Sequence, residues 1–300
     1  MNRPRRETIC AVIVTRDPDD GFTDRLTGIS RQVGGMVVVD NGSRETALGQ
    51  ILALSSTRTD IHLIRNRENE GIARALNQGS DRAGELGFEW ILLFDQDSEP
   101  EASMVTVLAA IWDDHPDRER LAIIGSNYWN RDPGQPEFTF PPAGERLWIK
   151  RRSVITSGSL IPFRGYIAAG PFREDFFIDH VDDEYAFRAR RRGCRVVMSR
   201  APLMKHAIGV RQKHRVLFHT VETSNHSPER RYYMSRNVMQ MAREYLFFEP
   251  GWVLWKLFKL LKSVFLIMLF EENRRKKLQY LLKGVWHGLR GKLGRLEDLV

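Results

Sequence analysis

The sequence is poor in cysteine and has no long apolar run near its N-terminus. Only two cysteines occur in 300 residues, and Cys10 lies inside an apolar segment. A thiol in that setting is more often a buried core residue in a reducing compartment than half of a disulfide. The first apolar run extends only from Ile9 to Val14, which is too short for a signal peptide. We therefore expect a protein of the cytoplasm.

Glycine-rich phosphate-binding motifs are also missing. The sequence contains neither G-x-G-x-x-G nor G-x-x-x-x-G-K-S/T, so a dinucleotide fold and a P-loop fold have little support. The same absence argues against a sugar-nucleotide pyrophosphorylase, which we expect to begin with a glycine-rich phosphate loop. What the sequence has instead is positive charge, a formal net charge of +8. That balance favours an acidic partner: nucleic acid, anionic lipid or a phosphorylated substrate.

Short apolar segments alternate with helical patterns through the first half of the chain. Segments 9–15, 36–39, 61–64 and 90–94 each fit a buried strand. Alternation at this spacing predicts an α/β fold, with a mostly parallel, Rossmann-like central sheet built from right-handed βαβ units. Three of these strands end in Asp or Asn. Because open α/β sheets bind ligands at the carboxyl ends of their strands, we expect a nucleotide crevice there.

The fourth strand ends in two carboxylates, Asp95 and Asp97. Residues two apart at a strand end point the same way, so both side chains can face one point in space. Converging carboxylates suit a hard divalent cation such as Mg²⁺ or Mn²⁺. The alternative is a polar turn in which Asp97 or Ser98 caps the following helix. The residues alone leave both interpretations open.

Two further positions at this edge have a functional and a local interpretation. Asp40 can accept hydrogen bonds from a pyrimidine ring or a ribose hydroxyl, or it can form an Asx turn with the Asn41-Gly42 pair. Gly71 opens a helix and could admit a phosphate to the N-terminal amides, or it could simply end the Asn69-Glu70 turn.

The second half of the chain contains an acidic block at 174–185, followed by an arginine-rich helix at about 184–192. The block holds more carboxylates than helix capping needs, and one with a raised pKa could act as a general base. The alternative is an acidic first turn stabilised by the helix dipole and by Arg188, four residues after Glu184.

The motifs taken together resemble those of a known family. Segments 40–43, 69–73 and 94–98 look like successive motifs of the inverting family 2 glycosyltransferases of the GT-A fold. The resemblance covers most of residues 9–240 and is closest to bacterial rhamnosyltransferases of O-antigen and surface-polysaccharide synthesis. It implies transfer of L-rhamnose from dTDP-L-rhamnose to a lipid-linked glycan, while UDP-galactofuranose, another hexose or an N-acetylhexosamine donor stays open. The first motif departs from the family, with Thr15-Arg16-Asp17 where a Thr-Tyr-Asn type turn is usual.

The resemblance also implies roles for individual residues. Asp95-Gln96-Asp97 would be the D-x-D motif that holds Mn²⁺ or Mg²⁺ on the donor diphosphate, and His206 would complete the metal site. Asp182 would be the catalytic base, with Asp183 as the alternative. Contacts to the nucleotide-sugar are expected from Thr15, Asp40, Asn69, Gly71, Asp95 and Gln96. Contacts to the acceptor or diphosphate are expected from Ser157, Gly158, Asp179, Tyr232, Tyr233 and Arg236, although a basic amphipathic helix explains the last three nearly as well.

The C-terminal segment is apolar from Trp252 to Phe270 but contains Lys256, Lys259 and Lys262. A helix spanning a bilayer would be penalised by roughly 2.5–3.5 kcal/mol for each lysine near its centre. An amphipathic helix lying in the membrane plane gains about 1 kcal/mol per Lys or Arg at an anionic leaflet. The three lysines fall within one helical arc, which leaves the opposite face apolar. A basic run at 274–277 and an amphipathic stretch at 278–293 continue the pattern.

The predicted organisation is therefore a GT-A domain at 1–245 and a helical tail at 246–300. We expect the tail to attach peripherally to the anionic cytoplasmic face of the inner membrane, close to a lipid-linked acceptor. A helical hairpin that packs on the catalytic domain or forms a homo-oligomer is the alternative. Nucleic acid is not expected as a partner, because the basic residues accompany an amphipathic tail and an acidic block. The Pro- and Gly-rich segment 130–144 is expected to be a mobile loop.

Overall fold

The computed structural model describes residues 2–130, 136–140, 146–206, 212–216 and 219–299. The chain forms two compact units. Unit 1 comprises Met1–Phe172 and Tyr185–Ala207, and unit 2 comprises Arg173–Glu184 and Ile208–Val300. The expected loop at 130–144 lies mostly outside the described residues. Of the described helices, none combines the length and apolar character that a membrane span requires.

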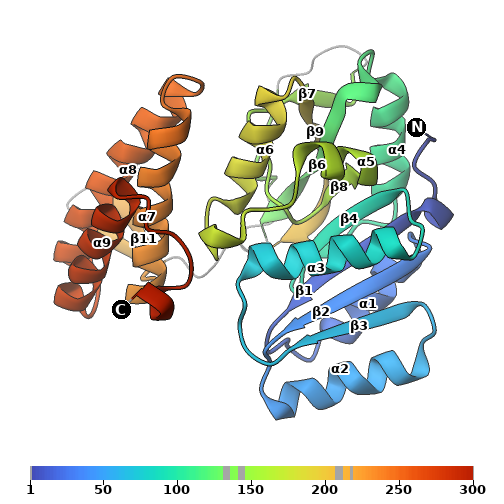
Figure 1. Ribbon diagram of the computed structural model, residues 1–300, viewed down its shortest axis with the longest axis horizontal. Helices are drawn as coiled ribbons and strands as arrows, with labels where there is room; N and C mark the ends of the chain where they lie inside the picture. The colour runs from blue at the N-terminus through green and yellow to red at the C-terminus, as the bar shows by residue number, and fades with distance from the viewer. Residues whose placement is uncertain (1, 131–135, 141–145, 207–211, 217–218, 300) are drawn as a thin grey trace. The chain divides into compact units, whose positions relative to one another are not determined.

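Four parallel strands form one half of the sheet in unit 1 (Figure 1). They are β1 (Ile9–Thr15), β2 (Gly35–Asn41), β3 (Ile61–Asn66) and β4 (Trp90–Asp95), in the spatial order β3-β2-β1-β4. Every residue of β1 and β2 is buried, which explains why their sequences are continuous apolar runs instead of alternating ones. The predicted parallel sheet is confirmed in this half.

The other half of the sheet is mixed. Strand β8 (Ser159–Pro162) runs antiparallel to both β4 and β6 (Leu121–Asn130), and β9 (Arg195–His206) runs parallel to β6. Two short strands, β5 (Glu99–Pro100) and β7 (Trp148–Lys150), pair antiparallel with β9. The pairing of β5 with β9 matters for function, because it places the segment after β4 beside the end of β9.

Helices pack on this sheet. They are α1 (Phe22–Ser30), α2 (Glu45–Thr57), α3 (Ile72–Glu85), α4 (Met104–Asp114), α5 (Phe163–Ala169) and the later part of α6 (Val181–Arg191). A Cβ atom at Gly79 of α3 would lie 2.3 Å from Val12 Cγ1, so only glycine permits this close approach to β1. Trp90 and Trp112 meet edge to face with their ring centroids 5.0 Å apart and are both buried. Such a pair adds specific geometry to a large buried apolar area.

Unit 2 is built on three helices that contact one another: α7 (Pro228–Tyr245), α8 (Pro250–Phe270) and α9 (Arg274–Leu289) (Figure 1). It also contains the hairpin of β10 (Gln212–Val216) and β11 (His219–Thr223) and the first turn of α6. Gly284 and Gly288 let α9 approach α7 closely, since a Cβ at either would lie 2.4 Å from a carbonyl oxygen of α7. Helix α7, which the sequence assigns to the first domain, thus packs with the C-terminal helices.

Candidate active site

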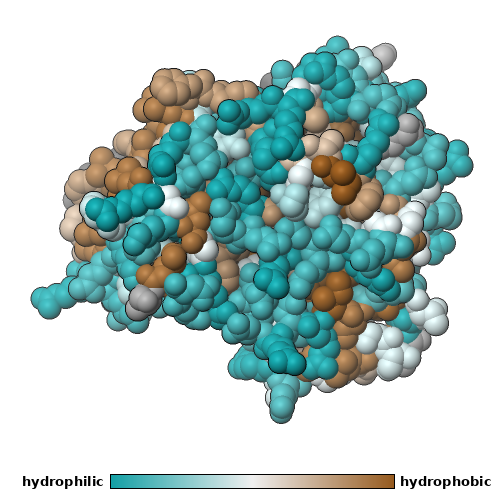
Figure 2. Space-filling view, viewed as in Figure 1, coloured by the Kyte–Doolittle hydropathy of each residue, from teal (hydrophilic) through white to brown (hydrophobic). Residues whose placement is uncertain are grey.

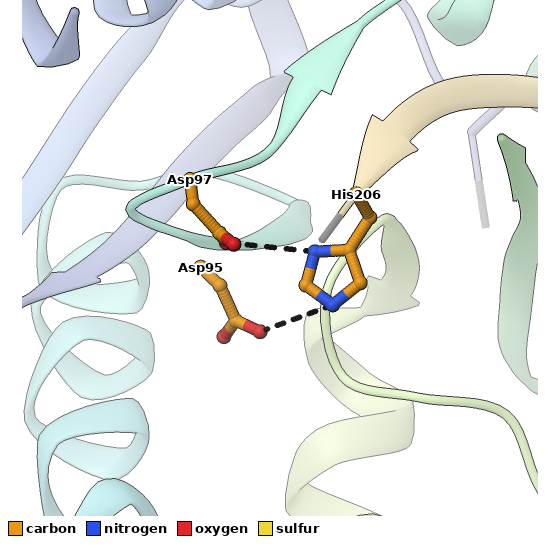
Figure 3. Close-up of side chains that lie close together, drawn as sticks. All are labelled: Asp95, Asp97 and His206. Carbon is orange, nitrogen blue, oxygen red and sulfur yellow. Dashed lines mark ion pairs between the residues drawn. The ribbon is translucent and has the colours of Figure 1, made fainter. Parts of the chain in front are cut away.

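Three predicted metal ligands converge at the carboxyl edge of the sheet in unit 1 (Figure 3). Asp95 is the last residue of β4, Asp97 lies in the turn that follows, and His206 is the last residue of β9. His206 Nε2 is 3.9 Å from Asp95 Oδ2, and His206 Nδ1 is 3.5 Å from Asp97 Oδ1. One candidate ligand atom from each of the three residues lies within 4.8 Å of the others. Two carboxylates and an imidazole at this spacing form a donor set that fits a divalent cation.

Two buried serines hold this cluster in place. Ser98 Oγ lies 3.0 Å from His206 Nδ1 and 2.7 Å from Ser157 Oγ. Ser157 Oγ also accepts a hydrogen bond from the backbone N–H of Asp95 at 3.1 Å. Both serines are 1% exposed. Ser157, which the sequence assigns to the acceptor or diphosphate, thus bonds to β4 and to Ser98 of the turn, and Ser98 in turn contacts His206 of β9.

The electrostatics of the cluster are dominated by the burial of Asp95 and by the closeness of its two carboxylates. Loss of water raises the pKa of Asp95, the charge of His206 acts in the opposite direction, and Asp97 raises that pKa further. Like charges that are brought together disfavour ionisation, and a cation relieves that repulsion. The arrangement is thus suited to binding a cation.

Gln96, between the two aspartates, connects the turn after β4 to β1. Its Oε1 accepts hydrogen bonds from Thr15 Oγ1 at 2.9 Å and from the backbone N–H of Arg16 at 2.6 Å. Its carbonyl oxygen accepts from Arg25 Nε at 2.7 Å. Thr15 and Gln96, both expected to contact the donor, thus contact each other. A direct contact from either to a nucleotide-sugar stays a prediction.

Asp40 forms the Asx turn that the sequence offers as the alternative to a nucleotide contact. It is 2% exposed, and its Oδ1 accepts a hydrogen bond from the backbone N–H of Ser43 at 3.2 Å, as in an Asx turn. This turn uses Oδ1 of the Asp40 carboxylate and does not involve Oδ2. The proposed contact to a pyrimidine therefore stays a prediction beside this structural role.

Asn41 is an organising residue that sequence reasoning missed. Its Oδ1 accepts from the backbone N–H of Glu70 at 3.0 Å and from Asn66 Nδ2 at 3.1 Å, while its Nδ2 donates to Asn69 Oδ1 at 3.0 Å. Asn69 Oδ1 in turn accepts from the N–H of Gly71. Gly71 has a φ of 87°, a conformation that favours glycine. In the sequence Asn41 directly follows Asp40 at the end of β2, but its hydrogen-bond partners lie 25 or more residues away.

Gly158 is placed in unit 1 beside the same edge. Its φ is +73°, and its backbone N–H donates to the carbonyl of Leu93 in β4 at 2.8 Å. A Cβ at this position would lie 2.7 Å from Met204 Sδ of β9. The positive φ and this close contact with Met204 both require glycine here, whatever it contacts in a substrate complex.

The acidic block belongs to unit 2. Asp182 and Asp183 lie in the first turn of α6, and Asp182 Oδ1 accepts a hydrogen bond from the backbone N–H of Asp183 at 2.8 Å. Loss of water, and then the negative charge of Asp183, raise the pKa of Asp182 to about 6, against opposing effects of His180 and Lys256. A carboxylate whose pKa is close to neutral is suited to accepting a proton at physiological pH.

The turn that precedes Asp182 is strained. Phe177, Asp179 and His180 have φ values of 62°, 65° and 62°, although none of them is glycine. Each such residue costs about 1–3 kcal/mol and persists only where the surroundings fix it. Clusters of this kind gather at functional sites, and this one leads directly into the two aspartates.

Helix α7 fixes this turn through two buried side chains. Arg236 Nη2 donates to the carbonyls of Asp175 at 2.9 Å and Phe176 at 2.8 Å. Asn237 Nδ2 donates to the carbonyls of Ile178 and Asp179, both at 2.8 Å. Arg236 and Asn237 are each 0% exposed. Sequence reasoning assigned Arg236 to the acceptor or diphosphate and passed over Asn237, whereas the structure uses both to hold the turn.

The other predicted acceptor residues of unit 2 also have partners inside it. Tyr232 OH lies 2.8 Å from His287 Nδ1, and Tyr233 OH accepts from the backbone N–H of Leu296 at 2.8 Å. The two tyrosines are 0% and 5% exposed. Asp179 pairs with Arg230 at 3.2 Å. Their proposed roles towards a substrate stay predictions.

Comparison with known proteins gives the family. Residues 23–164 match the sequence model of glycosyl transferase family 2. The chain is also 31% identical over 248 residues to the dTDP-rhamnosyl transferase RfbF of Shigella flexneri, which covers 79% of this chain and 80% of that protein. This chain belongs to glycosyltransferase family 2. Both the family and the sugar-transferring activity expected from the sequence are confirmed. The family match includes the D-x-D turn and ends before the acidic block and His206.

Solved structures show that the fold is the GT-A fold of glycosyltransferases. A TarS fragment from S. aureus aligns with a TM-score of 0.60 at 14% identity, covering 94% of this chain and 81% of that one. The mannosyltransferase PcManGT from Pyrobaculum calidifontis, solved with GDP-Man and Mn²⁺, aligns with a TM-score of 0.57 at 14% identity, covering 97% and 89%. The predicted fold class is therefore confirmed for this family 2 glycosyltransferase.

Proposed function

We propose that this family 2 glycosyltransferase is an inverting rhamnosyltransferase that uses dTDP-L-rhamnose. The observation that carries the proposal is the 31% identity to a dTDP-rhamnosyl transferase, which extends over about four fifths of both chains. The cluster of Asp95, Asp97 and His206 supports a metal-dependent reaction of a sugar diphosphate. A UDP-galactofuranose or other UDP-hexose donor is the alternative.

Asp95, Asp97 and His206 would hold Mn²⁺ or Mg²⁺. A bound cation supplies positive charge that stabilises the departing nucleoside diphosphate. The imidazole ligand favours Mn²⁺ over Mg²⁺, and the similar fold of PcManGT was solved with Mn²⁺. Ser98 and Ser157 would orient these ligands through the contacts described above.

Asp182 is the general base of the proposed reaction. The carboxylate takes the proton from the acceptor hydroxyl while the hydroxyl oxygen forms a bond to the anomeric carbon. The bond from that carbon to the diphosphate breaks, and the electron pair leaves with the diphosphate. Attack from the face opposite the leaving group inverts the configuration. The raised pKa of Asp182 supports this role, and Asp183 is the alternative base.

A donor screen tests the proposal. Calorimetry with Mn²⁺ would compare dTDP-rhamnose, UDP-galactofuranose, UDP-N-acetylglucosamine and GDP-mannose, with Asp97→Ala as the matched variant. We expect metal-dependent binding of dTDP-rhamnose in the parent protein and loss of that binding in the variant. Preferential binding of a UDP-sugar would overturn the rhamnosyl assignment and leave the metal site in place. Metal-independent binding in both proteins would overturn the role of Asp97.

The C-terminal helices support attachment to a membrane surface. Leu254, Phe258, Leu261, Phe265 and Leu269 recur on one side of α8, and each is 54–62% exposed. On α9, Leu282 and Trp286 are 63% and 52% exposed. In Figure 2 brown side chains gather over the part of the molecule that contains the C-terminal helices. Burying one such half-exposed side chain contributes about 1 kcal/mol.

We propose that this apolar side lies on the anionic cytoplasmic face of the inner membrane, where a lipid-linked glycan serves as acceptor. The exposed Lys259, Lys262 and Arg274–Lys276 border it and would contact acidic headgroups. Flotation with phosphatidylglycerol vesicles should recover the parent protein but not the Leu261→Glu/Phe265→Glu double variant. Loss of flotation in neutral vesicles is also expected. A parent protein that stays unbound but sediments as a dimer, with the double variant monomeric, would assign the surface to a second copy instead.

A further inference from the structure

The two adjacent aspartates at the start of α6 have different partners. Asp183 Oδ2 lies 2.9 Å from His180 Nδ1 and 3.3 Å from Lys256 Nζ. Asp182 instead accepts a hydrogen bond from the backbone N–H of Asp183. All four residues belong to unit 2, and Asp183, His180 and Lys256 all act on the pKa of Asp182. Asp183 is therefore in contact with a lysine and an imidazole, while Asp182 is bonded to a backbone N–H.

Lys256 reaches this cluster from the inner side of α8. The sequence predicts that Lys256, Lys259 and Lys262 share one helical arc, and Lys256, at one edge of that arc, contacts Asp183. Its side chain is 25% exposed and lies on the same side as Trp252, which is 8% exposed, whereas Lys259 and Lys262 are exposed. Residues four apart lie on one helix face, and Trp252 is the residue one turn before Lys256.

An aromatic contact orients the lysine. Lys256 Nζ lies 4.8 Å from the centre of the Trp252 ring, a cation–π distance. The same ring meets His180 edge-on, with centroids 5.6 Å apart. Trp252 thus contacts both Lys256 and His180, the two side chains that contact Asp183, and it is itself buried. The ion pair is part of a packed cluster and not a solvent-exposed pair whose contribution would be small.

We propose that Lys256 is a positioning residue of the transfer reaction: with His180 it holds Asp183 as an ion-paired carboxylate, so that Asp182 is the carboxylate that takes the acceptor proton. This inference rests on the proposed function, because it needs a general base in the acidic block. It adds a residue of the C-terminal helices to the machinery that selects that base.

The physical reason lies in how neighbouring carboxylates titrate. Two adjacent acidic groups share their protons as a pair, and the group with cationic partners stays ionised while the other takes the proton first. The negative charge of the ionised group then raises the pKa of its neighbour into the range that is useful for a general base. Removing the Lys256 charge would make the pair bind protons more tightly. The base would then be protonated at a higher pH, and activity would be lost earlier as pH falls.

The test is the pH profile of kcat for the full-length protein and four variants. Lys256→Met should move the midpoint of the acidic limb upwards by about one unit, which is roughly a fivefold loss at pH 6, approaching tenfold well below the midpoint, and little loss at pH 9. Lys256→Arg should restore the parent midpoint. Lys259→Met removes the same charge one turn away and should leave the midpoint in place. Asp183→Asn should move it downwards, since the repelling charge is gone while Lys256 remains.

The outcomes are distinguishable from failure of the proposed function. Equal loss of kcat at every pH in Lys256→Met would overturn the positioning role and indicate a structural one. A shift of the same size in Lys259→Met would also overturn it, because the effect would then be a general one of surface charge. Loss of dTDP-rhamnose binding in the parent protein would instead overturn the proposed function. Retained turnover in Asp182→Asn together with an inactive Asp183→Asn would overturn both the base assignment and this inference.

Discussion

The candidate metal cluster of unit 1 and the acidic block of unit 2 are assembled in different ways. The candidate metal cluster joins residues more than a hundred positions apart, yet Asp95 and His206 each end a regular strand of one hydrogen-bonded sheet, and Asp97 lies in the turn directly after the first of them. The acidic block is contiguous in sequence, but it follows three non-glycine residues with positive φ and is held by side chains of α7 and α8. A contiguous motif can thus depend on distant elements more than a dispersed one does.

The largest expected effect is on the base. Asp182→Asn keeps the size and the hydrogen-bonding capacity of the side chain but removes its basicity, so kcat should fall by about 10³-fold, within the range for general-base catalysis. In the parent protein activity should fall as pH drops through about 6, because Asp182 then becomes protonated. Calorimetry of dTDP-rhamnose binding is the control, and we expect it to be unchanged. Near-normal turnover in the variant would contradict the assignment.

Asn237→Leu tests whether the acidic block depends on α7. The substitution removes the amide that donates to the carbonyls of Phe176, Ile178 and Asp179 and leaves these buried groups without that donor. We expect a loss of about 3 kcal/mol in the free energy of unfolding, measured in urea, together with a lower kcat.

Ser235→Ala is the matched control for this substitution. Ser235 is buried in the same helix and bonds to the carbonyl of Leu281 at 2.9 Å, away from the strained turn. It should lower stability by about 1 kcal/mol and leave kcat unaltered. A parallel loss of kcat in both variants would show that activity follows the stability of unit 2 as a whole.

His206→Ala tests the strand-edge site. Because Asp95 and Asp97 remain on their turn, the variant should still bind a cation, and the Mn²⁺ concentration for half-maximal activity should rise about 100-fold with kcat largely recovered at saturation. Ser98→Ala, which removes a contact of the imidazole and keeps all three ligands, should raise that concentration only about tenfold. Equal effects of the two substitutions would argue that His206 is not itself a ligand.

The parts that could be predicted from the sequence are those governed by local periodicity. The strand that ends at Asp95 followed from an apolar run, and the convergence of Asp95 with Asp97 followed from the geometry of a strand end. His206 could be assigned only through the family resemblance, because its approach depends on the pairing of Glu99 with Lys205. Neither segment has a sequence pattern that predicts this pairing.

The roles of Asn41, Asn237 and Lys256 could not be predicted for a related reason. Each is a polar residue whose partners lie 25 or more positions away, and polar residues at strand ends and on basic helices are common without such roles. Helical periodicity grouped Lys256 with its neighbouring lysines. Only the contact between Lys256 and Asp183 shows which of them belongs to the acidic cluster.

Helix α8 has two opposite sides with different surroundings. Its diameter therefore sets the distance between its exposed apolar side and the acidic block. Lys256 on its inner side contacts the acidic block, while Leu254, Phe258 and Leu261 are exposed on the outer side. An α-helix with its side chains is about 10–12 Å across. With the outer side in lipid, the proton-accepting carboxylate would stand about one helix diameter above the acyl chains. Under the proposed membrane attachment, only hydroxyls on sugars close to the lipid carrier would then approach the proposed base.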